Sequence, residues 1–216
     1  MKTAIILDLD GTILNTLDDL CDSVNAALKK GGFPLRTLDE VRNFVGNGAK
    51  NLIIRSLGDN ANEETIEKTL SDFKAHYETN KTNKTAPYAG MLEALDELKT
   101  RGCKLAIVSN KHDDAVQGLY NQFFSETCDF ALGNCDFLPK KPAPDMILYA
   151  LKKIGKTVDE AVYIGDSEVD VTTAKNTNIP CISVSWGFRD KNILEAAGAE
   201  IIVDTPDELL KALKNL

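Results

Sequence analysis

The chain has 216 residues, of which 43% are hydrophobic and 27% are charged, and its net charge is −8. This length and balance are typical of a globular protein with one well-buried domain, or with a core domain and a smaller second one. The acidic excess argues against a nucleic-acid backbone or an anionic membrane as the main partner, because both require a basic protein surface.

The N-terminal segment and the scarce residue types narrow the function classes further. No apolar stretch is long enough to cross a bilayer, and Asp8 interrupts the first apolar run before it could serve as a signal sequence, so we expect a cytoplasmic protein. The five cysteines are scattered without a Cys-x-x-Cys pair, which favours buried thiols over disulfides or a zinc site. With only two histidines, a Ser-His-Asp triad or a His-rich metal site has almost no residues to draw on.

Apolar runs of strand length recur along the chain and alternate with helical patterns. Most of these runs are continuous rather than alternating in polarity, which is typical of parallel strands covered by helices on both faces. Leucines at helical spacing lie between the runs, as at Leu95 and Leu98. The pattern predicts a doubly wound α/β fold with its ligand at the carboxyl ends of the strands. The predicted strands are Ala4 to Leu9, Lys104 to Ser109, Phe130 to Leu132, Ala161 to Ile164, Cys181 to Val184 and Ile201 to Val203.

The region from about Asn15 to Pro87 breaks this alternation. It carries apolar stripes at helical spacing, from Leu17 to Leu28, from Leu52 to Leu57 and from Ile66 to Tyr77, and these predict an all-helical insert. The polar segment "NKTNKTAPYAG", Asn80 to Gly90, is typical of a linker that returns to the core. We therefore predict a Rossmann-like core formed by residues 1–14 and 87–216, with a helical cap inserted as residues 15–86.

Polar side chains gather where the predicted strands end. "DLDGT" places Asp8 and Asp10 after the first strand, "IVSNK" ends the second, and "KKPAPD" and "YIGDSEVD" follow later. Two acids at positions i and i+2 of a strand point the same way, so each raises the cost of ionising the other. A hard cation such as Mg²⁺, held by carboxylate oxygens, would neutralise Asp8 and Asp166, while a lysine balances the remaining charge.

These four motifs, in this order, resemble those of the haloacid dehalogenase-like phosphatases, and the resemblance covers the whole chain. "VGNG" at Val45 to Gly48, "SNK" at Ser109 to Lys111 and "SWGFRD" at Ser185 to Asp190 are further likenesses, to the phosphoglycolate phosphatase group with a helical cap. The resemblance implies a Mg²⁺-dependent phosphatase of small phosphorylated metabolites, with 2-phosphoglycolate as the favoured substrate.

The resemblance also implies roles for the core residues. Asp8 would attack phosphorus and become an aspartyl phosphate, and Asp10 would protonate the leaving oxygen and then take a proton from water. Ser109 would bond a phosphoryl oxygen. Lys141, which directly precedes the proline, would hold Asp8 and the phosphate, with Lys140 as second choice. Asp8 must be ionised, so contact with the metal and lysine should lower its pKa.

Metal and substrate contacts are assigned in the same way. Asp166 would bind the metal directly, and Asp170 would bind it through water or orient a ligand. Backbone N–H groups after Asp8 would cradle the phosphoryl group, and the Gly46 to Gly48 segment would be a cap loop facing the site, or else a plain turn between helices. The candidate metal residues are Asp8, Asp10, Asp166 and Asp170, and the candidate substrate-binding residues are Leu9, Gly11, Asn110, Gly46, Asn47 and Gly48.

Other functions share parts of this pattern. Sugar phosphomutases of the family tend to have a histidine shortly after the first motif, where this chain has Leu20, and a dehalogenase has no need for an acid at position 10. A pyrophosphatase, or a non-catalytic module that accepts phosphate on Asp8, stays open. The core motifs recognise any phosphoryl group, so they do not identify the substrate.

Overall fold

The computed structural model describes residues 2–216, and the chain divides into two compact units. The first unit consists of two segments, the N-terminal one up to Leu14 and Pro87–Leu216. The second unit is the segment between them, Asn15–Ala86. At the two crossings between them, β2 (Leu14–Asn15) and β3 (Ala86–Pro87) pair as a two-stranded sheet. The first unit holds the strands with the chemical motifs, and the second is helical.

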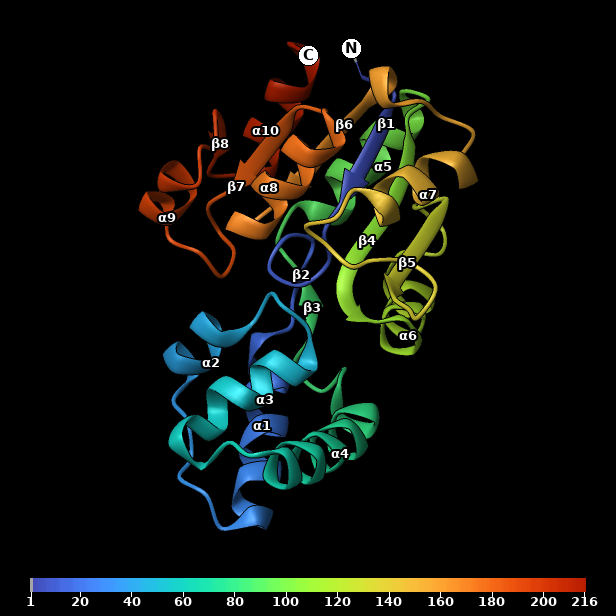
Figure 1. Cartoon of the computed structure of the whole chain (residues 1–216). Coiled ribbons are helices and arrows are strands. Elements are labelled where there is room, and N and C mark those ends of the chain that lie inside the picture. Colours follow the sequence, from blue (N-terminus) through green and yellow to red (C-terminus); the bar gives the residue numbers. More distant parts are fainter. Residues whose placement is uncertain (1) are drawn as a thin grey trace. The chain divides into compact units, whose positions relative to one another are not determined.

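The first unit is built on a six-stranded sheet whose strand order is β5-β4-β1-β6-β7-β8 (Figure 1). All its strand pairs are parallel. This is the strand order of the doubly wound fold. In that fold the order in which successive strands are added reverses between the first and fourth strands, here β1 and β6. The predicted α/β class is therefore confirmed. The strands are β1 (Ala4–Leu7), β4 (Lys104–His112), β5 (Phe130–Asn134), β6 (Ala161–Gly165), β7 (Cys181–Val184) and β8 (Ile201–Val203).

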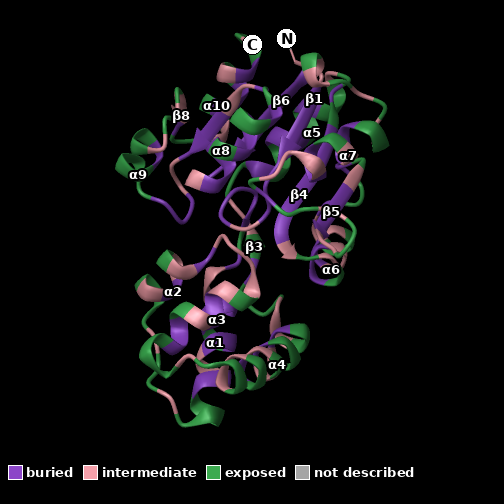
Figure 2. Cartoon of the chain, viewed as in Figure 1, coloured by how far each residue is buried: buried purple, intermediate pink, exposed green. Residues whose placement is uncertain are grey.

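Helices cover both faces of this sheet, and most residues of its strands are buried (Figure 2). Ile5 and Leu7 of β1 pack in one cluster with residues of α5, α6 and α10, whereas Ala4 and Ile6 pack in another with α7 and α8. Alternate residues of a strand point to opposite faces, so a strand between two helical layers has no polar side. The helices are α5 (Met91–Thr100), α6 (Asp113–Phe123), α7 (Asp145–Lys153), α8 (Glu168–Thr177), α9 (Lys191–Ala196) and α10 (Pro206–Lys214).

Four strand ends differ from the prediction. β5 continues to Asn134 rather than Leu132, and β6 continues to Gly165 rather than Ile164. β1 stops at Leu7 rather than Leu9, because the Leu9 carbonyl accepts amide bonds from Thr12, Ile13 and Leu14 and the chain turns there. β4 continues beyond Ser109 to His112, with a register shift against β5 between Val108 and His112. The motif "SNK" is therefore part of an extended strand end rather than the loop after it.

The second unit consists of α1 (Leu17–Gly31), α2 (Leu38–Phe44), α3 (Ala49–Leu57) and α4 (Glu63–Asn80), with a short 3₁₀ helix between α3 and α4. The apolar stripes predicted α1, α3 and α4. They missed α2, whose start is a capping box in which Thr37 and Glu40 bond each other's backbone N–H groups. The return segment is tied to α1 by buried Asp19, which accepts the amides of Lys84 and Thr85.

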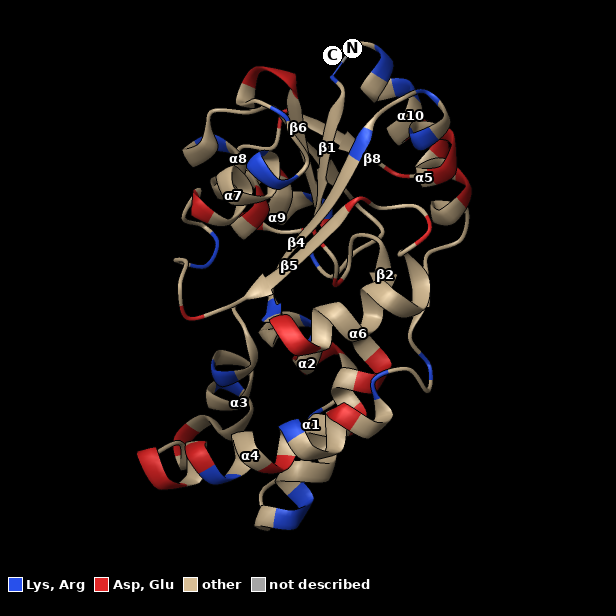
Figure 3. Cartoon of the chain, turned by 90° about the vertical axis from the view of Figure 1, so that its right-hand side faces the viewer, with Lys and Arg blue, Asp and Glu red and all other residues tan. Residues whose placement is uncertain are grey.

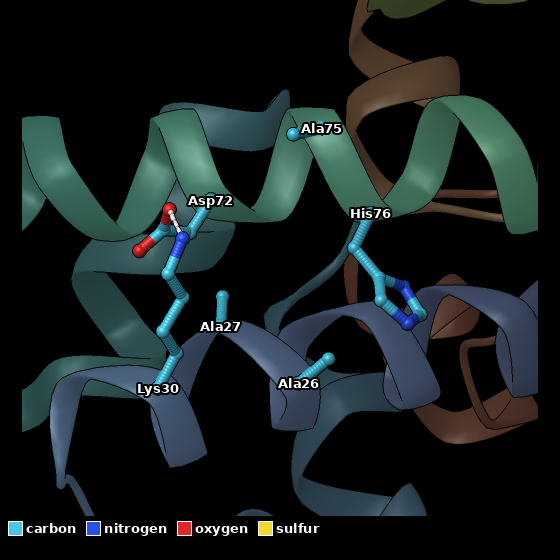
Figure 4. Close-up of a pocket in the computed structure, with 6 residues that line it drawn as sticks. All are labelled: Ala26, Ala27, Lys30, Asp72, Ala75 and His76. Atoms are coloured by element: carbon cyan, nitrogen blue, oxygen red, sulfur yellow. Dashed lines mark hydrogen bonds and ion pairs between the residues drawn. The ribbon is translucent and has the colours of Figure 1, made fainter.

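A pocket of about 210 Å³ lies between α1 and α4 within the second unit (Figure 4). Three alanines line it together with His76 and the ion pair of Lys30 with Asp72, whose nitrogen and oxygen are 2.6 Å apart. His76 Nδ1 lies 3.0 Å from the Ser23 hydroxyl. None of the predicted site residues lines this pocket.

Charged residues lie mainly on the helices and loops, and the strands of the sheet carry few (Figure 3). Among residues 2–216, no helix combines the length and apolar character that a membrane span requires. In the part of the chain that the structure describes, the buried acidic residues are Asp8 and Asp166, which follow β1 and β6, Asp170 in the first turn of α8, and Asp19 in α1.

Candidate active site

The loop after β1 is shaped by close contact with Asp166. Gly11 has a positive φ of 85°, and a Cβ at this position would lie 2.3 Å from Asp166 Oδ2. Both observations require glycine, which explains the last residue of "DLDG" on steric grounds. The loop and the end of β6 meet at the point where the strand order reverses, the usual ligand position in this fold.

Lys141 forms hydrogen bonds with three other residues of the site. Its buried Nζ donates to Asp8 Oδ1, to the Tyr163 hydroxyl and to Asp170 Oδ1, each at 2.8 Å. Burial alone would lower the pKa of Lys141, but the carboxylates of Asp170 and Asp8 outweigh it and raise the pKa above its ordinary value. An ammonium has three donors, so contact with a phosphoryl group would have to replace one of these bonds.

The neighbouring lysine is placed differently. Lys140 is exposed, whereas Lys141 is buried at 2% exposure. The side chain of Asn110, predicted to bind substrate, instead donates to the backbone carbonyl of Lys141 at 3.0 Å. In this structure Asn110 therefore fixes the lysine segment against the end of β4, and its predicted substrate contact stays a prediction.

Asp170 is surrounded by donors. Oδ1 accepts from Lys141 and from the Tyr163 hydroxyl at 2.9 Å, and Oδ2 accepts from the amide and hydroxyl of Ser167 at 3.1 and 2.6 Å. A carboxylate has about four acceptor positions, and these four donors fill them. This arrangement suits a residue that orients its neighbours better than one that binds a metal directly.

Asp166 is held by the segment that follows β7. The Phe188 amide donates to Oδ2 at 2.7 Å, and the Thr12 hydroxyl donates to Oδ1 at 3.3 Å. A Cβ on Gly187 would lie 2.3 Å from the Asp166 Cβ, so this residue too must be glycine for the segment to approach. Phe188 thus orients a candidate metal ligand through its backbone.

Three buried carboxylates lie close together beside the loop after β1. Each of Asp8, Asp166 and Asp170 offers an oxygen, and these oxygens lie within 4.8 Å of one another. Burial raises the pKa of Asp8 to about 7, with Lys141 offsetting this and Asp170 adding to it, and burial together with Asp170 and Asp8 raises the pKa of Asp166 well above its usual value. Hard oxygen donors with an excess of buried negative charge fit a divalent cation.

The expected lowering of the Asp8 pKa is therefore not what the protein groups produce by themselves. Desolvation of the buried carboxylate is the largest effect, and the single lysine beside it is shared with Asp170. A cation bound next to Asp8 is the missing influence that would lower the pKa.

Asp10 lies apart from this cluster and is paired with Lys111. Lys111 Nζ donates to both carboxylate oxygens of Asp10, at 2.9 and 3.1 Å, and the two side chains are only 8% and 13% exposed. The carboxylate of Asp10 is not one of the three acidic groups that converge, so its predicted metal contact stays a prediction. The two acids of "DLDGT" have different partners, which is what different roles require.

The remaining predicted residues are placed as follows. Ser109 is buried at the end of β4, and its hydroxyl accepts the Lys111 amide at 3.3 Å. The Gly11 amide donates to the Leu14 carbonyl at 2.9 Å, so its expected part in a phosphate cradle would require that bond to open. Leu9 is fully buried. Gly46, Asn47 and Gly48 form the turn between α2 and α3, where both glycines have positive φ, and their role toward a substrate stays a prediction.

Sequence reasoning missed several residues of the site. Tyr163 and the Phe188 amide were given no part in it, and Lys111 was named only as a polar residue at the strand end, although each bonds a candidate catalytic or metal residue. Arg189, left without a role, is buried and donates from Nε to Glu168 at 2.8 Å. The contacts of Lys111 and Phe188 join distant parts of the chain, whereas Tyr163 lies in the same quoted motif as Asp170, seven residues before it.

Comparisons with known proteins agree with this geometry. The family described as haloacid dehalogenase-like hydrolase matches residues 5–184. A phosphoglycolate phosphatase from Colwellia psychrerythraea is 33% identical over 225 residues, an alignment that covers 99% of this chain and 97% of that protein.

Solved structures are similar over the full length. The crystal structure of a phosphoglycolate phosphatase candidate from Lactobacillus delbrueckii subsp. bulgaricus has a TM-score of 0.93 and 36% identity and covers 99% of both chains. CbbY from Rhodobacter sphaeroides, crystallised in complex with phosphate, has a TM-score of 0.76 and 25% identity and covers 97% of this chain and 96% of that one.

Proposed function

The chain belongs to the haloacid dehalogenase-like hydrolase family, and from this premise we propose that it is a Mg²⁺-dependent phosphatase that hydrolyses small phosphate monoesters through an aspartyl phosphate, with 2-phosphoglycolate as its substrate. It is a phosphoric monoester hydrolase of the phosphoglycolate phosphatase-like group. The observation that carries the proposal is the separation of two acids: Asp8 bonds Lys141 among buried carboxylates, while Asp10 bonds Lys111 outside them.

In the first step, a carboxylate oxygen of Asp8 attacks phosphorus as the bond from phosphorus to the ester oxygen breaks. Lys141 holds Asp8 Oδ1, so it orients the carboxylate for this attack. Asp10 gives its proton to the departing ester oxygen, and the alcohol leaves. Asp8 and phosphate are then joined in a mixed anhydride.

In the second step, Asp10 takes a proton from a water molecule, the water oxygen bonds to phosphorus, and the bond between phosphorus and Asp8 breaks. Inorganic phosphate leaves, and Asp8 is again a carboxylate. Asp10 ends as it began, with its proton, so the cycle balances. Ser109 and backbone N–H groups near Asp8 would hold the phosphoryl oxygens throughout.

Asp8 and Asp166 would hold Mg²⁺, and Asp170 would keep Lys141 and Ser167 in place beside them. The ion supplies electrostatic stabilisation of negative charge on the phosphoryl oxygens and on Asp8. The raised pKa values of Asp8 and Asp166 support a bound cation, because a positive charge beside two buried carboxylates favours their ionised forms.

The choice of substrate rests on similarity rather than on the core chemistry. Relatives that cover nearly the whole chain carry the name phosphoglycolate phosphatase. We keep the sequence-based expectations of a cytoplasmic location and of a small phosphorylated metabolite as the partner. Pyrophosphatase and phosphomutase activities are the competing outcomes.

The test is release of inorganic phosphate from 2-phosphoglycolate, pyrophosphate, a sugar phosphate and p-nitrophenyl phosphate, each with Mg²⁺ and with EDTA. We expect the highest kcat/KM on 2-phosphoglycolate, and no turnover in EDTA until Mg²⁺ is restored. Asp8→Asn should abolish turnover and leave the fold intact, because an amide cannot form the phosphoenzyme. Mg²⁺-dependent turnover by Asp8→Asn would remove Asp8 as the nucleophile, and single-turnover labelling without release would indicate a phosphate-accepting module.

A further inference from the structure

We propose that Lys111 recognises a carboxylate that the substrate carries on the carbon bonded to its ester oxygen. Lys111 would thus determine the preference for 2-phosphoglycolate over phosphate monoesters of the same length that lack a carboxylate. The inference rests on the proposed phosphatase function and deepens it by assigning substrate selection to a residue of the core unit.

The position of Lys111 is determined by its contact with Asp10. The two residues lie 101 positions apart in the chain, and Lys111 Nζ reaches both oxygens of Asp10 at 2.9 and 3.1 Å from the extended end of β4. Both side chains are largely buried, at 8% and 13% exposure. A two-point contact of this kind holds the ammonium close to the proposed general acid.

Proton transfer from Asp10 requires the ester oxygen of the substrate to lie beside Asp10, and therefore near Lys111. Asp10 must come within about 3 Å of the ester oxygen to transfer a proton to it. In 2-phosphoglycolate one methylene separates that oxygen from the carboxylate. A carboxylate so close to the ester oxygen lies within reach of an ammonium that is itself in contact with Asp10.

The acidic residues of the core unit explain why a substrate carboxylate would need a cationic partner such as the Lys111 ammonium. Asp8 lies in the loop after β1 with Asp166 and Asp170 close to it, so a substrate carboxylate enters a site rich in acidic residues that would repel it. The Lys111 ammonium, held beside Asp10, would offset this repulsion with a charge-assisted hydrogen bond to the substrate carboxylate. Lys141 shows the same arrangement in this structure, because its Nζ bridges Asp8 and Asp170 at 2.8 Å to each.

The first measurement compares Lys111→Met with the wild type on 2-phosphoglycolate and on ethyl phosphate, which has the same carbon chain without the carboxylate. We expect kcat/KM to fall about tenfold to a hundredfold more on 2-phosphoglycolate than on ethyl phosphate, the range for one lost hydrogen bond to a charged group. The excess loss should lie mainly in KM. Lys111→Arg should recover part of the preference, because it keeps the charge.

A matched control is available on the same strand. Lys104 begins β4 and forms an ion pair with Asp129 in which nitrogen and oxygen are 2.7 Å apart. Lys104→Met removes the same charge from the same strand, and it should leave the ratio of the two kcat/KM values unchanged. Thermal unfolding of both variants shows whether each is folded.

The second measurement separates binding from proton transfer. In the Asp8→Asn background, calorimetry with Mg²⁺ should give a Kd for 2-phosphoglycolate that rises about tenfold or more when Lys111→Met is added, while the Kd for ethyl phosphate changes little. A structural or proton-positioning role would not produce this difference.

The outcomes distinguish the possible failures. Equal losses on both alkyl phosphates, with a smaller loss on p-nitrophenyl phosphate, would mean that Lys111 only positions Asp10, and would overturn the inference. Equal losses on all three esters, or an unchanged Kd for 2-phosphoglycolate, would also overturn it. Absence of turnover by the wild type on every ester would refute the proposed function, and calorimetry would still decide the contact of Lys111.

Discussion

Replacement of Tyr163 by phenylalanine tests the buried network that holds Lys141. The Tyr163 hydroxyl accepts from Lys141 at 2.8 Å and donates to Asp170 at 2.9 Å, and the residue is fully buried. Tyr163→Phe removes both bonds and adds no atoms. The ring still fills its place in the apolar cluster, so the effect is that of the hydroxyl alone.

The expected magnitude follows from the charges of the partners. A hydrogen bond to a charged group stabilises by about 1.5–3 kcal/mol. The sum of two bonds overstates the loss, because Lys141 and Asp170 remain bonded to each other at 2.8 Å. We therefore expect the free energy of unfolding to fall by about 2–3 kcal/mol, which for a chain of this length lowers Tm by about 4–12 °C.

The assay is thermal unfolding followed by circular dichroism, together with steady-state kinetics on 2-phosphoglycolate. We expect kcat to fall about tenfold with little change in KM, because a less constrained Lys141 orients Asp8 less well. Tyr120→Phe is the control: its hydroxyl donates to the neutral carbonyl of Cys128 at 3.0 Å, so it should cost about 1 kcal/mol and leave kcat unchanged. If the two variants behave alike in both Tm and kcat, the reasoning about Tyr163 is refuted.

Three further predictions concern the metal, the cap and a buried thiol. Asp166→Ala should weaken Mn²⁺ or Mg²⁺ binding, measured by calorimetry, more than Asp170→Ala does, because four donors already occupy the oxygens of Asp170; the reverse order would make Asp170 the direct ligand. Asn47→Ala should lower kcat/KM on 2-phosphoglycolate less than Lys111→Met does, and a parallel loss on p-nitrophenyl phosphate would assign the loop a general role in turnover. Burial raises the pKa of Cys128 to about 12, so this thiol should react very slowly with a disulfide reagent at pH 8, and faster as the pH approaches 12 or when the protein unfolds; rapid reaction of the folded protein would contradict its burial.

Much of the architecture could be predicted from local patterns. Continuous apolar runs identified each strand of the sheet, because a strand between two helical layers has no polar face, and helical spacing identified α1, α3 and α4. The "DLDGT" and "GDSEVD" motifs located Asp8 and Asp166, since residues that follow parallel strands meet at one edge of the sheet. The start of α2 was missed, because its signal is the polar capping box of Thr37 and Glu40 rather than an apolar stripe.

The partners of the site residues depended on the tertiary structure. Ion pairs such as Lys111 with Asp10, and the bond from the Phe188 amide to Asp166, join segments that only strand order and helix packing bring together. The bond from Lys141 to Asp170, and the raised pKa of Asp8, likewise depend on burial and on distant neighbours, whereas the bonds from Ser167 to Asp170 belong to a local capping box. Residue type and spacing therefore determined which chemical groups reach the end of the sheet, whereas the packing of distant segments decided which group each one contacts, because hydrogen bonds and desolvation act over a few ångströms in space and not along the chain.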